Sequence, residues 1–204
     1  MLSSLFVTLP RQNEYGMKQI TIMAALVMAC MTGCTSDKKA AQEEVKQMFQ
    51  LESVDENSGL QRMQVSRIRQ EIACKGKKFQ LAVERTPDDK LPRVKSDMGL
   101  FVDNSIQVKI TRENGATLFE KAFTKNDFAA YLPEKYLKRS VLEGLVFDDV
   151  RTAEKKEIIL AASVSYPMTD LYVPFSLLIS QDGKLSISMD EDMGALPFLE
   201  EHKE

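Results

Sequence analysis

An alternation of apolar and polar residues begins near Gln64 and continues to Asp190. A strand with one buried and one solvated face has a period of two residues, so each alternating run predicts a β-strand. Because the runs follow one another with turns between them, we expect a mainly β domain of antiparallel strands, arranged as a meander, a curled sheet or a small barrel. The runs predict about eight strands, at residues 64–74, 79–83, 106–111, 117–123, 141–150, 157–166, 173–179 and 185–189.

Glycines mark turns and one irregular position in this pattern. Asn114-Gly115 lies between two alternating runs and predicts a hairpin with a type I′ turn, because both residues tolerate positive φ. Gly144 interrupts its run and predicts a bulge or bend. A helix is the competing prediction for residues 60–72, whose apolar positions also lie near helical spacing.

One short helical insertion separates the earlier strands from the later ones. Thr124 or Asn126 fits the cap position of a helix, and Asp127 places a carboxylate in the first turn, where the helix dipole favours it. Pro133 begins a second short helical turn at residues 134–139. Proline is tolerated at the first position of a helix, because the N–H group that it lacks would have no partner within the helix. We expect the insertion to plug one end of a curled sheet that closes toward a barrel. An α+β fold is the alternative.

A hydrophobic leader precedes the alternating region. Lys18 is followed by an apolar run over residues 20–31 and then by Gly33 and Cys34, which is the order of a bacterial lipoprotein signal whose cysteine is acylated. The run is shorter than the ~20 residues that span a membrane, so we prefer a cleaved signal to an uncleaved anchor. Cys30 is the alternative acylation site, but the chain turns polar only after Cys34.

The leader divides the chain into parts with different roles. We expect an upstream extension and signal peptide at residues 1–33, a polar tether at 34–60, a single β-rich domain at 61–192 and a C-terminal tail at 193–204. Acylation of Cys34 would attach the mature protein to a membrane, and stable attachment needs more than one lipid chain.

Composition excludes several classes of function. The chain has 27 Lys and Arg against 30 Asp and Glu, and the leader carries Arg11, Lys18 and Glu14, so processing lowers the net charge from −3 to −4. This charge argues against a nucleic-acid partner. The single histidine, His202, lies in the polar tail, which leaves Ser-His-Asp and Cys-His catalysis without a base. We therefore predict no His-based or Cys-based metal site and no cofactor. Cys74 lies on a predicted strand and is expected to be buried and inert.

Three polar residues are candidates for a small polar site near the junction between the helical insertion and the later strands. They are Lys125, Asp127 and Asp170. Capping and turn formation are the preferred interpretation of all three. The acidic run at residues 190–192 lacks the spaced oxygens and the distal glutamate of a calcium loop, so we interpret it as a solvated strand end.

Four separated motifs carry a resemblance to a known family: TPDDKLP at 86–92, FTKNDF at 123–128, LEGLVF at 142–147 and YPMTDLYVP at 166–174. In this order they resemble an uncharacterised lipoprotein family of Bacteroidetes, classed as a domain of unknown function. The resemblance implies the anchored location and supplies no activity, catalytic residue or ligand. Surface-exposed lipoproteins of that phylum tend to carry an acidic run after the cysteine. Here only Asp37 precedes two lysines, which favours the periplasmic face of the outer membrane.

The expected function is that of a non-enzymatic lipoprotein of the cell envelope. Its partners would be the membrane, through the lipid anchor, and an envelope protein or a small ligand. The alternatives are a carboxylate-based hydrolase of envelope polysaccharide, which needs two carboxyl groups ~5–9.5 Å apart across a pocket, and a barrel that holds a lipid or another hydrophobe in a hollow apolar interior.

Overall fold

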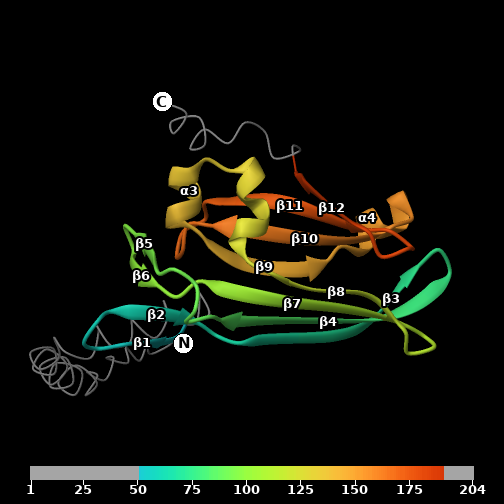
Figure 1. The fold of residues 1–204 in the computed structure, drawn as a ribbon, viewed down its shortest axis with the longest axis horizontal. Coiled ribbons are helices and arrows are strands. Elements are labelled where there is room, and N and C mark those ends of the chain that lie inside the picture. The colour runs from blue at the N-terminus through green and yellow to red at the C-terminus, as the bar shows by residue number, and fades with distance from the viewer. Residues whose placement is uncertain (1–50, 191–204) are drawn as a thin grey trace, which may run out of the picture. The chain divides into compact units, whose positions relative to one another are not determined.

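The structure is a computed structural model that describes residues 51–190. The predicted leader, Cys34, most of the predicted tether and the C-terminal tail lie outside the described residues. The described residues form twelve strands in three four-stranded sheets, together with three short helices (Figure 1).

Two of the sheets contain the strands that the alternation predicts. Sheet I has the order β3-β4-β7-β8, and sheet II has the order β12-β11-β10-β9, with all neighbours antiparallel. The bounds in sheet I are Ser66–Cys74 (β3), Lys77–Pro87 (β4), Asn104–Arg112 (β7) and Thr117–Phe123 (β8). Those in sheet II are Val141–Phe147 (β9), Ile158–Ser165 (β10), Tyr172–Ile179 (β11) and Leu185–Met189 (β12).

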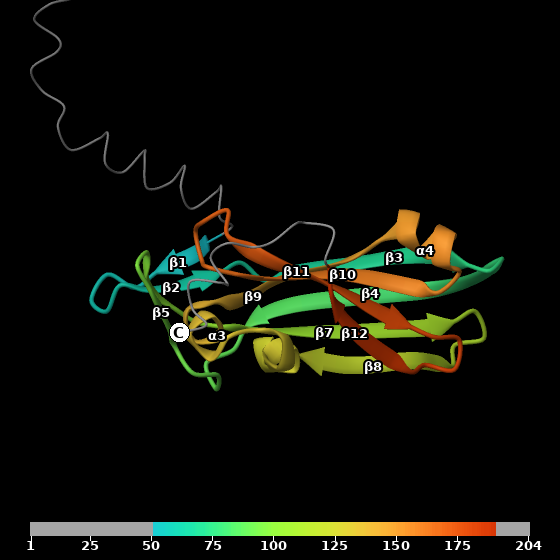
Figure 2. The same cartoon turned by 90° about the horizontal axis from the view of Figure 1, so that it is seen from above.

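Sheets I and II pack face to face around one core. Alternate residues of each strand point inward, so Phe79, Leu81 and Val83 of β4 are buried in the same cluster as Phe175 and Leu177 of β11. The strands of sheet II pass over those of sheet I (Figure 2). Burial of this apolar area, at roughly 25 cal/mol per Å², is the main force that holds the two layers together.

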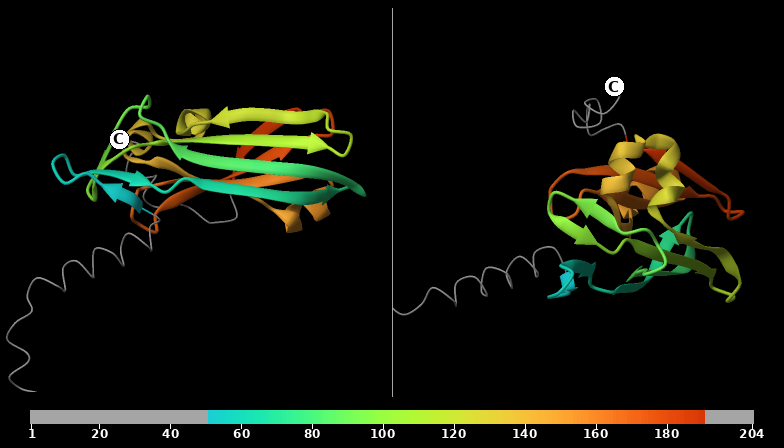
Figure 3. Two further views of the ribbon diagram at one scale, coloured as in Figure 1. Left: turned by 90° about the horizontal axis from the view of Figure 1, so that it is seen from below. Right: turned by 60° about the vertical axis from the view of Figure 1, so that its left-hand side comes forward.

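The third sheet lies at one end of the two layers (Figure 3). Its order is β1-β2-β6-β5, and the β2–β6 pair is parallel. It has its own small core, which includes Leu51, Met63, Phe101 and Val141. We call it the end sheet; its strands are Leu51–Val54 (β1), Leu60–Met63 (β2), Val94–Ser96 (β5) and Gly99–Phe101 (β6).

The helical insertion connects sheet I to sheet II. It contains the 3-10 helix η2 (Lys125–Tyr131) and the α-helix α3 (Glu134–Arg139), and Thr124 is the N-cap of η2 as predicted. Phe128 and Tyr136 are fully buried in the main core. The insertion therefore contributes to the core between the sheets.

The mainly β prediction is confirmed, and several details differ. Within residues 51–190 the sheets stack as separate layers and do not close into a barrel, because β3 and β8 end one sheet and β9 and β12 end the other. The end-sheet strands have only three or four residues each, too few to produce a clear alternation. Strand β1 lies in the segment expected to be tether. The competing prediction of a helix over residues 60–72 is wrong, because Leu60–Met63 form β2 and the strand predicted from Gln64 is β3, which begins at Ser66.

Two local predictions are wrong. The run predicted to continue as strand to residue 150 ends at Phe147, and the helix α4 (Asp149–Lys155) follows, with the Asp148 side chain accepting a hydrogen bond from its first turn. The β7–β8 hairpin is not type I′, because Gly115 alone of its two central residues has positive φ. Gly115 N instead donates to Arg112 O, and the register shifts beside the turn.

Candidate functional site

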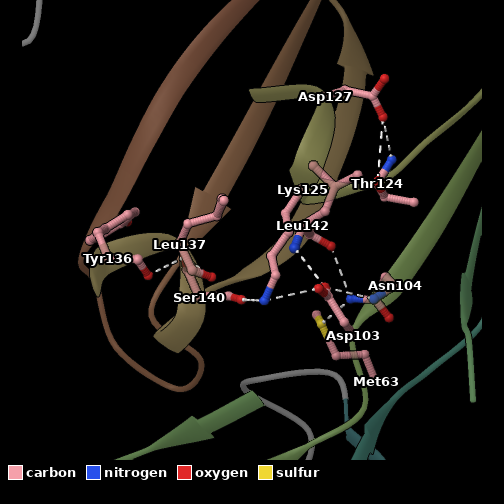
Figure 4. A network of polar contacts seen from close by, with 10 residues as sticks. All are labelled: Met63, Asp103, Asn104, Thr124, Lys125, Asp127, Tyr136, Leu137, Ser140 and Leu142. Carbon is pink, nitrogen blue, oxygen red and sulfur yellow. Dashed lines mark hydrogen bonds and ion pairs between the residues drawn. The ribbon is translucent and has the colours of Figure 1, made fainter. Parts of the chain in front are cut away.

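The three sequence-predicted site residues do not gather at one point. Lys125 and Asp127 both begin η2, but their side chains extend in different directions (Figure 4). Asp127 accepts a hydrogen bond from Thr124 N at 2.8 Å and pairs with Lys121 at 2.9 Å. Asp170 is exposed in the turn between β10 and β11. Asp127 therefore has the capping role that was the preferred interpretation.

Lys125 belongs to a buried polar network (Figure 4). Its ammonium nitrogen Nζ donates to Ser140 O at 2.7 Å and lies 3.2 Å from Asp103 Oδ2. The exposed fractions of the two charged side chains are 10% for Lys125 and 1% for Asp103. Burial raises the pKa of Asp103, and Lys125 together with two backbone N–H donors opposes that rise. The pair therefore joins the start of η2 to the start of β7.

The same network holds the backbone of β9. Asp103 Oδ1 accepts from Leu142 N at 3.1 Å, and Asn104 Nδ2 donates to Leu142 O at 2.9 Å. Asn104 Nδ2 also lies 3.1 Å from Met63 Sδ. Because β9 is an edge strand of sheet II, these side chains take the place of a neighbouring strand at Leu142. The network thus fixes the first half of β9 onto sheet I.

A β-bulge follows directly after this clamp. Gly144 pairs with Ser163 and Leu142 pairs with Val164, so Glu143 is the extra residue of β9. The bulge that the sequence predicts near Gly144 is therefore confirmed. Bulges bend a strand and change the direction of a side chain, and they are frequent beside functional sites.

Two charged residues meet at the bulge. Arg85 Nη1 donates to Glu143 O at 2.6 Å, and Arg85 Nη2 donates to Gln64 O at 3.1 Å. The Glu143 carboxylate accepts a hydrogen bond from Ser165 Oγ. Burial lowers the pKa of Arg85, and the charge of Glu143 opposes this change. Arg85 therefore links the connection between β2 and β3 to the bulged edge of β9.

An open groove of about 360 Å³ lies beside the bulge. It forms because the first half of β3 extends past the cover of sheet II: Ile68 is 36% exposed, whereas Ile72 on the same face is 3% exposed. We call this space the β9 groove. Its lining residues are Met63, Ser66, Ile68, Val83, Arg85, Ile106, Glu143, Gly144, Leu145, Val146 and Ser163.

The β9 groove combines an apolar floor with a few polar groups. Ile68, Val83 and Ile106 of sheet I supply apolar surface, and the hydroxyls of Ser66 and Ser163 supply hydrogen-bonding groups. This composition and this volume suit the binding of a small ligand or a short chain segment. Within residues 51–190 no group of three metal-ligating side chains is found.

Arg85 is the groove residue that sequence reasoning missed. It continues the inward-facing row of β4 after Phe79, Leu81 and Val83, where an apolar residue is expected. A charged residue at an inward position must find polar partners, so the register of β4 contained the signal. Its partners could not be inferred, because Glu143 is distant in the sequence and meets Arg85 only through the packing of sheet II on sheet I.

Together these features define a two-layer β domain with an open groove at a bulged sheet edge. The chain belongs to the family described as Domain of unknown function (DUF4738), whose model matches residues 44–187. The resemblance to a domain of unknown function is thereby confirmed, while the bacterial phylum and the lipid attachment stay predictions. No curated protein matches the chain. Within the part of the chain that the structure describes, no helix has the length and apolar character needed to cross a bilayer.

Proposed function

We propose that the protein is a lipoprotein of the cell envelope that binds a ligand or a protein partner in the β9 groove and does not change it chemically. Acylated Cys34 would hold it on the membrane, at the periplasmic face of the outer membrane. The observation that carries the binding proposal is the open groove of about 360 Å³ at the β9 bulge, with its apolar floor and its few polar groups.

The groove supports binding better than hydrolysis of a polysaccharide. Glycoside hydrolysis needs two carboxyl groups ~5–9.5 Å apart, one on each side of the scissile bond. Glu143 is the single carboxylate among the described residues that line the groove, and Ser165 already donates a hydrogen bond to it. A carboxylate engaged in this way, with no second one opposite, supplies neither the acid and base pair nor a free nucleophile.

The filled interior of the domain also argues against a function as a carrier of lipids or other hydrophobic molecules. Such a carrier needs a continuous apolar cavity of several hundred Å³. Between sheets I and II the space is filled by side chains, and Phe123, Phe128 and Phe175 are each fully buried there. The β9 groove lies at the edge of this core, with Val83 and Ile106 as shared residues, and opens to solvent beside Ile68 of β3. It therefore suits a ligand that reaches the domain from water.

Lipid attachment is tested by replacing the acylated cysteine. We expect the wild-type protein to fractionate with membranes and to show the mass of a processed, acylated chain. The Cys34→Ser variant should appear in the soluble fraction or accumulate with its leader intact. A matched Cys30→Ser variant should behave like the wild type. Acylation that is lost in Cys30→Ser and kept in Cys34→Ser would contradict the assignment of the anchor.

Binding is tested by blocking the groove. A Cβ atom at Gly144 would lie 3.5 Å from Ser163 Oγ, an ordinary contact, and Gly144 has no positive φ, so Gly144→Ala should fold normally. Gly144→Leu places a larger side chain in the groove. Chemical cross-linking and pull-down from detergent-solubilised membranes should recover a partner with the wild type and Gly144→Ala, and not with Gly144→Leu. Equal thermal stability of the variants would show that the loss is local. Recovery of no partner, together with turnover of a glycan or peptide library, would overturn the proposal.

A further inference from the structure

Sheet II leaves the first half of β3 without cover. Ile68 of β3, Val83 of β4 and Val108 of β7 form one cross-strand row on the inner face of sheet I, and their exposed fractions are 36%, 5% and 0%. The cover therefore ends between β4 and β3, where β9 is the last strand of sheet II. Near the other end of β3 the helix α4 lies alongside (Figure 2), and Ile72 on the same face is 3% exposed. The uncovered strip therefore lies where one more strand of sheet II would lie, ~4.8 Å beyond β9.

The backbone groups of β9 point alternately toward β10 and toward this strip. Asp148 N donates to Ile159 O at 2.9 Å, so the backbone at Asp148 faces β10. In an antiparallel ladder every second residue bonds to the same neighbouring strand. Since Phe147 and Leu145 alternate with the residues that bond to β10, their N–H and C=O groups point away from β10. Leu145 also lines the β9 groove, so its backbone groups face the groove from the side.

Part of this edge of β9 already has hydrogen-bond partners, and part does not. Polar side chains bond to the backbone of Leu142 and of Glu143. The next residues whose backbone faces outward are Leu145 and Phe147, and among the described residues no group bonds to their N–H and C=O. An unpaired backbone group with little access to water costs free energy comparable to a lost hydrogen bond, and Leu145 is 3% exposed. These groups favour a ligand with donors and acceptors at the spacing of a strand.

We propose that the β9 groove receives an extended segment of a partner protein, which adds to sheet II as a fifth strand beside β9. This inference rests on the proposed function and names the chemistry of the partner. Addition of a strand to an exposed sheet edge uses the backbone for affinity and alternate side chains for specificity. Antiparallel pairing of β9 strands from two copies would bring both β3 strands into the same strip, so a segment of another protein fits better than a second copy.

The two faces of β9 define which segment fits. Leu145 and Phe147 point toward sheet I, whereas Val146 between them is 51% exposed on the outer face. A residue of the added strand that lies opposite Leu145 would point toward Ile68 and the apolar floor, and so would the residue two positions along. The segment should therefore carry apolar residues at alternate positions. It would be short, because the bulge at Glu143 bounds the free edge on one side and α4 bounds it on the other.

Peptides of known sequence test the proposal without a natural partner. Short random peptides displayed on phage are selected on the detergent-solubilised wild-type protein and counter-selected on Gly144→Leu. We expect the recovered sequences to carry apolar residues at alternate positions, and the synthetic peptides to bind the wild type and Gly144→Ala alike. Each backbone nitrogen of one such peptide is then methylated in turn. Methylation should weaken binding about tenfold at the nitrogens that face β9 and leave it unchanged at those between, because one hydrogen bond and its close approach are lost.

A pair of substitutions at Leu145 tests the same hydrogen bonds from the protein side. Leu145→Ala and Leu145→Pro both remove the buried side chain, and only proline also removes the N–H that would donate to the segment. Proline is tolerated on sheet edges where its nitrogen faces away from the neighbouring strand. Leu145→Ala should keep peptide binding, and Leu145→Pro should lose it. Circular dichroism shows whether both variants fold, and the methylation series needs neither of them.

Three results would overturn the proposal. Methylation could be tolerated at every nitrogen, or its effect could lack the period of two, which would leave a groove that binds by side chains alone. The selection could yield no peptide whose binding Gly144→Leu removes. Sedimentation could show a dimer that Leu145→Ala keeps and Leu145→Pro loses, which would assign the edge to a second copy. In each case a partner recovered in the pull-down described above would leave the proposed function standing, so the two failures are distinguishable.

Discussion

Replacement of Lys125 by methionine removes one partner of a buried ion pair and keeps a side chain of similar length. Asp103 is 1% exposed and lies 3.2 Å from the lysine ammonium, so the substitution leaves its carboxylate in the interior without a counter-charge. The Ser140 carbonyl loses its donor at the same time. Two backbone N–H groups, of Asn104 and Leu142, still donate to Asp103 and limit the damage.

The magnitude follows from the burial of the pair. Removing one member of a buried ion pair typically costs 3–5 kcal/mol, and with the two remaining donors we expect about 3 kcal/mol for Lys125→Met. For a domain of this size that loss lowers the melting temperature by roughly 6–12 °C. The matched control is Lys121→Met, which breaks the more exposed pair with Asp127 and should cost about 1 kcal/mol or less.

Urea unfolding followed by circular dichroism measures Lys125→Met, Lys121→Met, Asp103→Asn and the double variant Asp103→Asn/Lys125→Met. The double variant should lose less unfolding free energy than Asp103→Asn and Lys125→Met lose in total, by roughly 1 kcal/mol or more, because it leaves no buried carboxylate. Equal losses for Lys125→Met and Lys121→Met would refute the view that the network clamps β9 to sheet I.

The pH dependence of Lys125→Met adds a second check. The pKa of Asp103 is raised above its ordinary value of 3.8, chiefly by burial, and loss of Lys125 raises it further. Because the pKa of this carboxyl is higher in the folded than in the unfolded protein, the unfolding free energy falls as the pH rises from the ordinary pKa of the group to its folded pKa. The cost of Lys125→Met should therefore be greatest at neutral pH and should shrink toward acidic pH. A cost independent of pH would contradict this account.

Three further predictions concern single sites. Hydrogen bonds from Arg62 and, to a smaller extent, from Arg93 lower the pKa of Asp89 from 3.8 to about 2. Asp89→Asn should therefore lower the unfolding free energy at pH 7, and the difference from the wild type should vanish as the pH falls toward 2. Gly183 has φ +81°, and its Cβ would lie 2.3 Å from a carbonyl oxygen of β8, whereas Gly115 has the same φ and open space. Gly183→Ala should therefore cost more than the ~1–2 kcal/mol expected from backbone strain in Gly115→Ala, and equal melting temperatures would contradict this. The Cys74 thiol is 5% exposed and its pKa is raised by burial, so it should react with Ellman's reagent only when the protein unfolds; fast reaction of the native protein would show an accessible thiol.

The long strands could be predicted from sequence because their burial is periodic. Strands β7 and β8 each have one face that is more buried than the other, and the alternation at residues 106–111 and 117–123 lies within their bounds. Strands β5 and β6 have three residues each, and no period can be recognised over that length. Whether the sheets close into a barrel could not be predicted either, because closure depends on which edge strands, distant in sequence, form hydrogen bonds with each other. The stacking of β9 on sheet I is set by Asp103 and Asn104, which are nearly 40 residues away.

The candidate site was only partly visible in the sequence. Lys125 was identified, but its partner Asp103 lies before a different strand, and nothing local connects the two residues. Gly144 indicated the bulge, which is a backbone feature and needs a small or flexible residue nearby. The groove itself is the product of two sheets that overlap incompletely beside β3, and this offset cannot be read from either strand alone.

Site-specific photo-cross-linking in intact cells tests the central claim, that the β9 groove is the binding surface, most directly. A photoreactive amino acid at Val146 would lie in the groove, and one at Val150, which is 63% exposed but does not line it, is the matched control. We predict a discrete cross-linked product from position 146 that is lost with Gly144→Leu, and none from position 150. Equal products from both positions, or a product from 146 that Gly144→Leu leaves unchanged, would contradict the assignment of the groove.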